Sequence, residues 1–315
     1  MRANAAESQA GTGARSEADM GKTEEFDRHR PLLFSIAYRM LGSVADTEDV
    51  LQEAYLRWRR TDGEVRSPRA YLSAVVTWLS IDQLRSARTR REEYVGAWLP
   101  EPILTEGENA ADAPAEAVIL EETLSMAFMV LLESLTPTER AVFLLREVFD
   151  YDYGEVSQLV GKSEENCRQI SRRARQSVAA RRPRFERSPE QEERLMGSFL
   201  EACANGDMES LVSLLSEDVI VWSDGGGKVR AALQPIRGAQ KVTRWFAGIL
   251  RKAPPGLTFR PASVNGHPGA VGYYADGSPQ SVMTLDVEGG SIRAIHIVVN
   301  PEKLANIPPL GEVER

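Results

Sequence analysis

The sequence predicts a multi-domain fold in which two all-α domains precede an α+β domain. Its 315 residues exceed the roughly 150 residues of an average domain. Apolar residues recur with the period of an α-helix up to about residue 185. Beyond Pro183 and Pro189, helical patterns are followed by short β-rich runs between turn residues, which is typical of helices packed on one face of a curved antiparallel sheet.

The composition is that of an ordinary globular protein, with 42% hydrophobic and 27% charged residues. No apolar run approaches the roughly 20 residues that a membrane span requires, so we expect no membrane partner. Residues 1–22 lack the apolar core of a secretory signal and predict a disordered tail on a cytoplasmic protein. Two cysteines, Cys167 and Cys203, are too few for a disulfide framework or metal cluster, and we expect no cofactor.

The first helical domain is predicted over residues 23–95. Gly42 ends its first helix, Asp46 opens the second, and Ser67-Pro68 precedes the third as a cap followed by proline. The apolar faces of the three helices are Leu33, Ile36, Ala37, Met40 and Leu41; Leu51, Ala54, Tyr55 and Trp58; and Leu72, Val75, Val76 and Leu79.

Residues 96–119 are predicted to form a linker, because prolines and glycines interrupt any periodicity. Between Gly96 and Leu135 there are eight acidic residues and no Lys or Arg. This acidic stretch is either a solvated connection or a mimic of nucleic acid that competes for a DNA channel. An apolar island at Trp98, Leu99, Ile103 and Leu104 predicts that part of the linker docks on a folded domain.

The second helical domain is predicted over residues 120–185. Thr136-Pro137-Thr138-Glu139 is a capping box with proline at the first helical position. A short helix at 154–160, a turn at Gly161-Lys162 and a longer helix capped by Ser163 make a helix-turn-helix pattern. The segment from Ser163 to Arg184 holds seven Arg and two Glu, which favours DNA binding, although a structural helix pair with a solvated basic face is the alternative.

The α+β domain is predicted over residues 190–305, followed by a tail at 306–315. Helices are expected around 195–203, 208–215 and 239–250, and strands around 219–222, 257–264, 270–274, 281–287 and 291–299. Asp224 precedes three glycines and is either a catalytic acid or part of a tight turn with positive φ, with Lys228 docking on the acidic linker. His296, alone in a strand, favours a structural role. Because no paired acid and base emerges, we expect no enzymatic activity.

Three segments in this order resemble bacterial RNA polymerase sigma factors of the extracytoplasmic-function class. They are the acidic-Gln-Glu helix at residues 46–58, Ile81-Asp82-Gln83-Leu84-Arg85, and the helix-turn-helix with Ser171-Arg172-Arg173-Ala174-Arg175. The resemblance covers residues 23–183. It implies that residues 23–95 are sigma region 2 and that residues 120–185 are sigma region 4.

Trp98-Leu99-Pro100-Glu101-Pro102, Asp224-Gly225-Gly226-Gly227-Lys228 and Asn300-Pro301-Glu302-Lys303-Leu304 resemble the motifs of one subgroup. This subgroup, often called ECF41, carries a C-terminal SnoaL-like domain with the cone-shaped fold of nuclear transport factor 2 (NTF2). The resemblance implies that these three segments connect the C-terminal domain to the sigma domains and replace a separate anti-sigma protein. The candidate interdomain residues are Trp98, Leu99, Pro100, Glu101, Pro102, Asp224, Gly225, Gly226, Gly227, Lys228, Asn300, Pro301 and Lys303.

The resemblance also implies partners, which are the polymerase core, through its largest-subunit clamp and its flap, and promoter DNA. Asp49, Gln52 and Glu53 match the positions that dock on the clamp. Region 2 opens the minus-ten element and region 4 reads the minus-thirty-five element. We expect DNA contacts at Arg66, Arg69, Arg85, Arg88, Glu165, Arg168, Gln169, Arg172, Arg173 and Arg175, of which Arg173 and Arg175 suit phosphate.

One position departs from the family pattern. Many members have Asn four residues before the Asp of the Ile-Asp-x-Leu-Arg motif, where this chain has Trp78, so Trp78 is either a core residue or a sign of different base reading. Two other functions remain as alternatives. One is a SnoaL-like domain that binds or converts a small apolar ligand with DNA binding as its readout, and the other is a simple operator-binding repressor.

Overall fold

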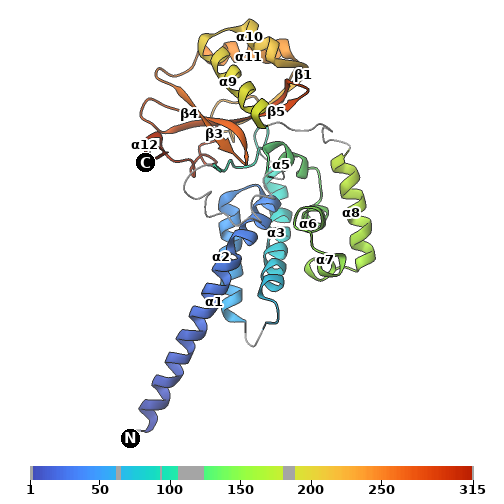
Figure 1. Cartoon of the computed structure of the whole chain (residues 1–315), viewed down its shortest axis with the longest axis vertical. Coiled ribbons are helices and arrows are strands. Elements are labelled where there is room, and N and C mark those ends of the chain that lie inside the picture. Colours follow the sequence, from blue (N-terminus) through green and yellow to red (C-terminus); the bar gives the residue numbers. More distant parts are fainter. Residues whose placement is uncertain (1–2, 62–64, 93, 106–123, 180–188, 314–315) are drawn as a thin grey trace. The chain divides into compact units, whose positions relative to one another are not determined.

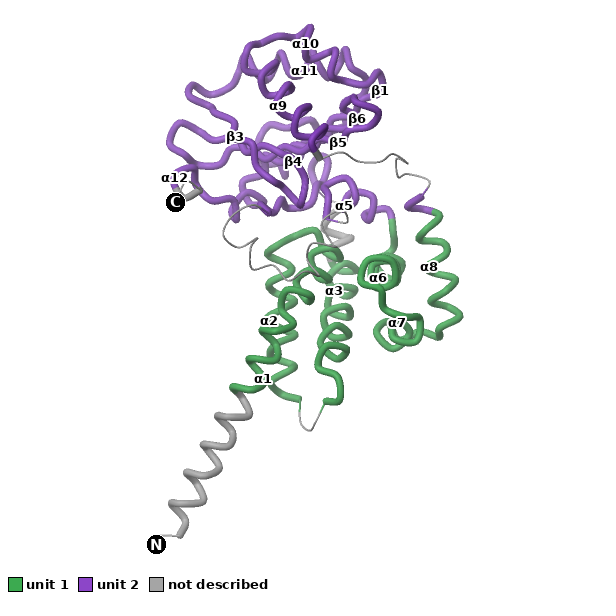
Figure 2. Tube along the Cα trace, in the orientation of Figure 1, with its two compact units in different colours: residues 1–87, 135–176 green, residues 88–134, 177–315 purple. Residues whose placement is uncertain are grey.

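The computed structural model describes residues 3–61, 65–92, 94–105, 124–179 and 189–313 (Figure 1). The chain divides into two compact units, one of residues 1–87 and 135–176 and the other of residues 88–134 and 177–315 (Figure 2). Most of both predicted helical domains therefore belongs to the first unit. The second unit contains the α+β domain together with the described part of the linker, residues 94–105.

The first unit begins with three helices, α1 (Ala3–Leu41), α2 (Val44–Arg60) and the larger part of α3 (Pro68–Glu92). The predicted apolar faces supply its core, in which Leu33, Ile36, Leu51 and Leu72 are buried. Helix α2 starts two residues before Asp46, because the Ser43 side chain accepts a hydrogen bond from the Asp46 N–H at 3.2 Å.

The predicted boundary of the N-terminal tail at residue 22 is wrong. Helix α1 begins at Ala3, and side chains are described from Met20 onward. Lys22 donates from Nζ to the Thr61 carbonyl at 2.6 Å, and its own carbonyl accepts from the Trp58 indole at 2.8 Å. These contacts with the end of α2 fix the backbone at a position where composition alone predicted disorder.

The remaining helices of the first unit are α6 (Pro137–Phe143), a π-helical turn at Leu144–Val148, α7 (Tyr153–Val160) and most of α8 (Glu164–Ala179). Both halves of the predicted capping box at Thr136 and Glu139 are present. Gly161 ends α7 with φ of 63°, and the Ser163 hydroxyl accepts from the Asn166 N–H at 3.3 Å. The predicted helix-turn-helix is therefore confirmed.

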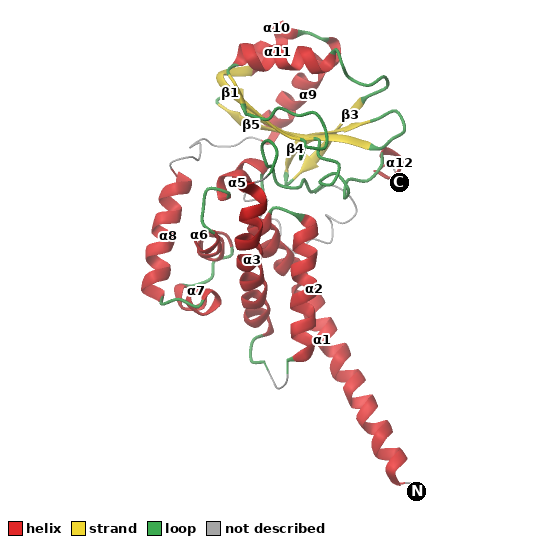
Figure 3. Cartoon of the chain, turned by 180° about the vertical axis from the view of Figure 1, so that it is seen from behind, coloured by secondary structure: helices red, strands yellow, loops and turns green. Residues whose placement is uncertain are grey.

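The second unit contains α5 (Met126–Leu132), α9 (Pro189–Asn205), α10 (Met208–Leu214), α11 (Ala239–Leu250) and α12 (Leu310–Val313). The strands of its sheet are yellow in Figure 3. They lie in the order β2-β1-β6-β5-β4-β3. The strands are β1 (Leu215–Asp224), β2 (Ile236–Arg237), β3 (Thr258–Val264), β4 (His267–Tyr273), β5 (Pro279–Glu288) and β6 (Ser291–Val298). The sheet is not wholly antiparallel as predicted, because β1 and β6 pair in parallel.

The two faces of this sheet bury different segments. Helices α9, α10 and α11 cover one face around Phe199, Phe246 and Ile295. On the other face, Leu99 of the linker, Met126 of α5 and residues 304–310 pack against strand side chains such as Val282 and Val298. Helix α5, predicted as part of the second helical domain, thus packs on the α+β domain, and the domain continues beyond residue 305 because Ile307 is buried.

The described residues include no helix that is both long enough and apolar enough to cross a membrane.

Candidate functional site

The outer face of α8 presents the polar side chains that the sequence assigned to DNA. Helical spacing buries Cys167, Ile170, Ala174 and Val178 on the inner side. The predicted DNA contacts Glu165, Arg168, Gln169, Arg172, Arg173 and Arg175 are all exposed. Six polar side chains on the second helix of a helix-turn-helix match the arrangement that enters the major groove of DNA.

The arginines of α8 differ in their neighbours. Arg168 donates to Glu164 at 2.9 Å and lies over the Tyr153 ring, with 5.2 Å between its guanidinium carbon and the ring centroid. Arg175 pairs with Glu147 at 3.6 Å. Within the described part of the chain, Arg172 and Arg173 form no ion pair, so both guanidinium groups are available to a nucleic acid without breaking one.

The arginines predicted to act in region 2 lie just before α3 and along it. Arg66 and Arg69 are exposed near its start, and Arg69 lies over the Tyr151 ring at 5.8 Å. Arg85 is exposed three turns beyond Ser73 and is 3.4 Å from Asp82. The side chain of Arg88 lies outside the described residues.

Trp78 is neither buried in the core nor left without contacts. Its side chain is 52% exposed, yet its indole N–H donates to the Leu159 carbonyl at 2.7 Å. A Cβ atom at Gly161 would lie 3.1 Å from the Trp78 ring, so glycine gives the indole access to the end of α7. The hydroxyls of Ser73 and Tyr151 also form a hydrogen bond of 2.9 Å. Together the two contacts attach α3 to the helix-turn-helix.

The polymerase-binding candidates lie together on α2. Asp49 and Gln52 are exposed and line a hollow of about 330 Å³ between α1 and α2. Glu53 lies beside this hollow and accepts from Arg57 at 2.8 Å. The three side chains supply two carboxylates and an amide to the surface of α2, and Arg57 offsets the charge of Glu53.

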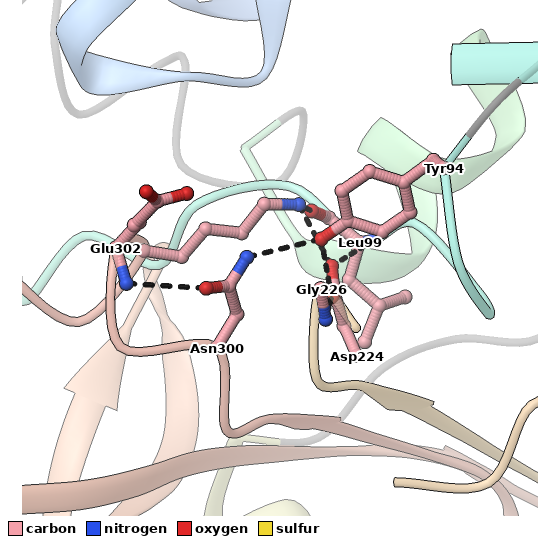
Figure 4. A network of polar contacts seen from close by, with 7 residues as sticks. Tyr94, Leu99, Asp224, Gly226, Asn300 and Glu302 are labelled. Carbon is pink, nitrogen blue, oxygen red and sulfur yellow. Dashed lines mark hydrogen bonds and ion pairs between the residues drawn. The ribbon is translucent and has the colours of Figure 1, made fainter. Parts of the chain in front are cut away.

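Asp224 is the centre of a polar network in the second unit (Figure 4). Its carboxylate is fully buried, with 0% exposure. One oxygen accepts from the Tyr94 hydroxyl at 2.6 Å and from the Gly226 N–H at 3.0 Å. The other accepts from the Leu99 N–H at 2.8 Å and from Lys303 Nζ at 2.7 Å. Four donors leave the carboxylate no free acceptor site for catalysis. Of the two roles predicted for Asp224, the geometry therefore fits the structural one.

Lys303 holds the described part of the linker. The predicted contact of Lys228 with the acidic linker falls largely on residues 106–123, which lie outside the described residues. Lys303 is 9% exposed, binds the Leu99 carbonyl as well as Asp224, and lies 4.2 Å from the Trp98 ring centroid. Lys228 pairs with Glu302 at the surface. Of these two lysines, only Lys303 reaches the buried carboxylate of Asp224.

We call the set Tyr94, Leu99, Asp224, Asn300 and Lys303 the linker clasp. Asn300 donates from Nδ2 to the Tyr94 hydroxyl at 3.1 Å, while its Oδ1 accepts from the Glu302 N–H at 3.1 Å. Burial and the hydrogen bond to Asp224 raise the pKa of Tyr94 well above its usual range. The phenol therefore stays protonated and continues to donate at any physiological pH.

The three glycines after Asp224 shape the turn beside the linker clasp. Gly226 and Gly227 have φ of 60° and 71°, which confirms the predicted left-handed turn. Gly225 is required for another reason, because a Cβ there would overlap the Val229 carbonyl. At Gly226 a Cβ would also overlap the Asn300 side-chain amide, so glycine allows Asn300 to reach Tyr94.

The rest of the predicted docking motif follows the surface of the α+β domain. Pro100, Glu101 and Pro102 are buried, and Glu101 accepts from Asn306 at 2.6 Å. Farther on, the Ile103 carbonyl accepts from the Asn265 N–H at 2.8 Å, and the Thr105 N–H donates to Ser263 at 3.0 Å. Pro301 is exposed and lies beside the linker clasp without being part of it.

Sequence reasoning missed two residues of this site, Tyr94 and Asn265. Tyr94 was placed at the end of the first domain, because only the folded chain brings its hydroxyl to Asp224, 130 positions away. Asn265 has φ of 54° and binds Ile103 and Leu124 through its side chain. The Asn265-Gly266 pair is a turn signal, but it does not reveal these partners.

The helical part of the chain matches two family models, Sigma-70 region 2 over residues 26–90 and Sigma-70 region 4 over residues 125–178. Together with the exposed basic face of α8, they define a promoter-recognising subunit of bacterial RNA polymerase. The ECF RNA polymerase sigma factor SigJ of Mycobacterium tuberculosis is 39% identical over 91% of this chain and 94% of its own length. The probable ECF sigma factor SigI of the same organism is 32% identical over 88% and 92%.

The crystal structure of Mycobacterium tuberculosis SigJ superimposes with a TM-score of 0.75 and 36% identity, covering 91% of this chain and 99% of that one. The chain belongs to the extracytoplasmic function sigma factors of RNA polymerase. It binds the polymerase core and promoter DNA and acts in transcription initiation. The SigJ structure covers 91% of this chain, so the match extends over the C-terminal α+β domain, for which the sequence predicts a SnoaL-like fold.

Proposed function

We propose that the SnoaL-like domain regulates this sigma factor by holding the linker between regions 2 and 4 in the linker clasp. The observation that carries this proposal is the buried Asp224 carboxylate, which binds the linker through Leu99 and Tyr94. A buried ion pair with Lys303 fixes the carboxylate from the domain side. The domain thereby performs the task of an anti-sigma partner within one chain.

Retention of the linker limits how far regions 2 and 4 can separate. The minus-ten and minus-thirty-five elements lie about 25 base pairs apart, or about 85 Å at 3.4 Å per step. Three residues of α3 in region 2 contact region 4: Ser73 and Arg69 contact Tyr151, and Trp78 contacts Leu159. These contacts must open before α3 and α8 occupy the two elements, and release of the linker provides the necessary length of chain.

The partner surfaces follow from exposure and charge. We assign Glu165, Arg168, Gln169 and Arg172 to base edges of the minus-thirty-five element, and Arg173 and Arg175 to phosphates. Arg66, Arg69, Arg85 and Arg88 are assigned to the minus-ten region. Asp49, Gln52 and Glu53 dock on the clamp of the largest polymerase subunit, and region 4 docks on the flap.

The α+β domain acts in binding and not in catalysis. Its inner cavity is lined by described residues that include no Asp, Glu or His. Cys203 lies on its wall, and burial raises the pKa of this thiol to about 12, so the thiol is neutral. Asp224, the acid of the glycine motif, is occupied in the linker clasp. These features favour a regulatory domain over an enzyme.

Run-off transcription with bacterial core polymerase tests regulation by the linker clasp. The variant Tyr94→Phe combined with Trp98→Ala removes a hydroxyl and a ring that face Asp224 and Lys303 while leaving the ion pair in place. Its transcript yield is expected to rise at least threefold over the parent chain. Lys228→Ala is the matched control, because its ion pair with Glu302 is exposed and lies outside the linker clasp.

Point variants are sharper than removal of the SnoaL-like domain, because removal would expose Leu99 and Met126, which pack against that domain. Circular dichroism and thermal unfolding verify that the variants are folded. Equal yields from the parent, the double variant and the control would contradict regulation through the linker clasp. A lower yield from the double variant would contradict its restraining role.

A further inference from the structure

The SnoaL-like domain contains a cavity between α9, α11 and the inner face of the sheet. Its volume is about 420 Å³, within the range of small-molecule sites. Aromatic and aliphatic side chains form most of its wall, among them Phe199, Trp245, Phe246, Met283 and Ile297. A wall of this kind favours an occupant with an apolar body.

The charged residues of the cavity are all of one sign. Arg230 and Lys252 line it and are exposed, which places their charges at its opening. Neither forms an ion pair with another described residue, and the lining includes no carboxylate. The hydroxyls of Ser223 and Ser281 and the amide of Gln280 supply further polar groups. The opening is therefore complementary to an anion.

Two strand ends connect this cavity to the linker clasp. Ser223 lines the cavity, whereas Asp224, the next residue of β1, points to the other face of the sheet and holds the linker. The same alternation holds after β6, where Val299 lines the cavity and Asn300 binds Tyr94. The Val299 N–H donates to the Asp224 carbonyl at 2.8 Å, which joins the two ends.

We propose that the cavity binds an amphipathic organic anion, with its apolar body against Trp245 and Phe246 and its acid group at Arg230 and Lys252. Occupancy fixes the ends of β1 and β6 and thereby tightens the linker clasp. This second step rests on the proposed regulatory function, whereas the binding step does not. A volume of about 420 Å³ is large enough for a small organic molecule of this kind.

Binding of dodecanoate to the full chain tests the first step. Dodecanoate has a suitable size, while dodecanol and dodecyltrimethylammonium share its chain without the negative charge. Isothermal titration below the micelle concentration of each compound is expected to give the tightest binding for dodecanoate. The variant Arg230→Ala with Lys252→Ala should weaken dodecanoate binding at least tenfold and leave dodecanol binding unchanged.

Lys241→Ala is the matched control, because Lys241 is an exposed cation of α11 that does not line the cavity. All three cations are on the surface, so these variants should fold like the parent. Equal affinity for the cationic and anionic probes, or an unchanged affinity in the double variant, would overturn the assignment of an anion. Absence of binding by any probe up to solubility would overturn the site itself.

Hydrogen exchange of the full chain tests the second step without polymerase. Saturating dodecanoate should slow exchange of the amides in residues 94–105 at least threefold. In the Tyr94→Phe, Trp98→Ala variant, dodecanoate should bind as before while this protection is lost. Unchanged linker exchange at saturation would overturn the coupling but not the binding site, and neither result depends on the transcription assay that tests the regulatory function.

Discussion

The arginine face of α8 and the linker clasp both depend on charged side chains, but the first is exposed and the second is buried. Arg172 and Arg173 remain in water and contribute little to the stability of the free protein. Asp224 and Lys303 have lost their water and depend on each other and on Leu99 and Tyr94. Exposed charge therefore serves a partner that arrives later, whereas buried charge fixes one arrangement of the chain itself.

The largest expected effect comes from breaking the buried pair. Asp224→Ala leaves Lys303 buried without its carboxylate, which typically costs about 3–5 kcal/mol of unfolding free energy. Asp218→Ala is the matched control, since its pair with Arg293 is exposed and worth about 0–1 kcal/mol. Urea unfolding of the full chain measures both. Equal shifts of the unfolding midpoint in the two variants would show that burial does not strengthen the dependence on Asp224.

A smaller effect is expected on the exposed side of the comparison, and only in the presence of DNA. Arg172→Ala should weaken binding to the cognate promoter by about 1–3 kcal/mol and relax base preference. Arg173→Ala should weaken binding to DNA of every sequence by a similar amount. Unfolding midpoints should not move. Fluorescence anisotropy with cognate and scrambled minus-thirty-five elements separates the two variants. If both variants reduce affinity equally for both DNAs, Arg172 contacts phosphate and reads no base.

Trp78 lies between these extremes, because it is half exposed and makes one specific hydrogen bond. Trp78→Phe removes the indole N–H that binds the Leu159 carbonyl, with an expected cost of about 0.5–1.5 kcal/mol in the first unit. Since this contact attaches α3 to the helix-turn-helix, the variant should also start transcription more readily from core polymerase. An unchanged unfolding curve for Trp78→Phe would mean that the contact is too weak to restrain α3.

The smallest expected effect concerns His296, which is buried near Thr284 with an unpaired Nδ1 among the described residues. Burial lowers its pKa below 6.5, and the charge of Asp286 opposes this only in part. His296 therefore binds a proton more weakly in the folded chain than in the unfolded chain. The free energy of unfolding should fall as the pH drops below about 6.5. Thermal unfolding from pH 8 to 5 should show a steeper loss in the parent than in His296→Leu. Parallel profiles would exclude His296 as the group responsible.

Much of the helical architecture could be predicted from local patterns. These patterns act within a few residues of chain, so the sequence alone predicts their effect. They are the apolar spacing of α2 and α8, the capping box at Thr136 and the glycine at 161. The exposed arginines follow from the same periodicity, because the buried face of a helix determines the outer one. The docking of the apolar island at Leu99 was also predicted, since an apolar cluster in a linker needs a surface to cover.

Only the tertiary structure decided which groups meet across long separations in sequence. Lys228 and Lys303 both lie within motifs that resemble those of the subgroup. The pairing of β1 with β6 nevertheless brings Lys303 to Asp224 and leaves Lys228 with Glu302. The sequence likewise did not predict the role of Tyr94. Nor did it predict the cavity that connects to the linker clasp through Ser223 and Val299. Local residue preferences depend on neighbouring peptide units. The hydrogen-bond partners of a buried carboxylate depend instead on which groups the tertiary structure places within bonding distance of it.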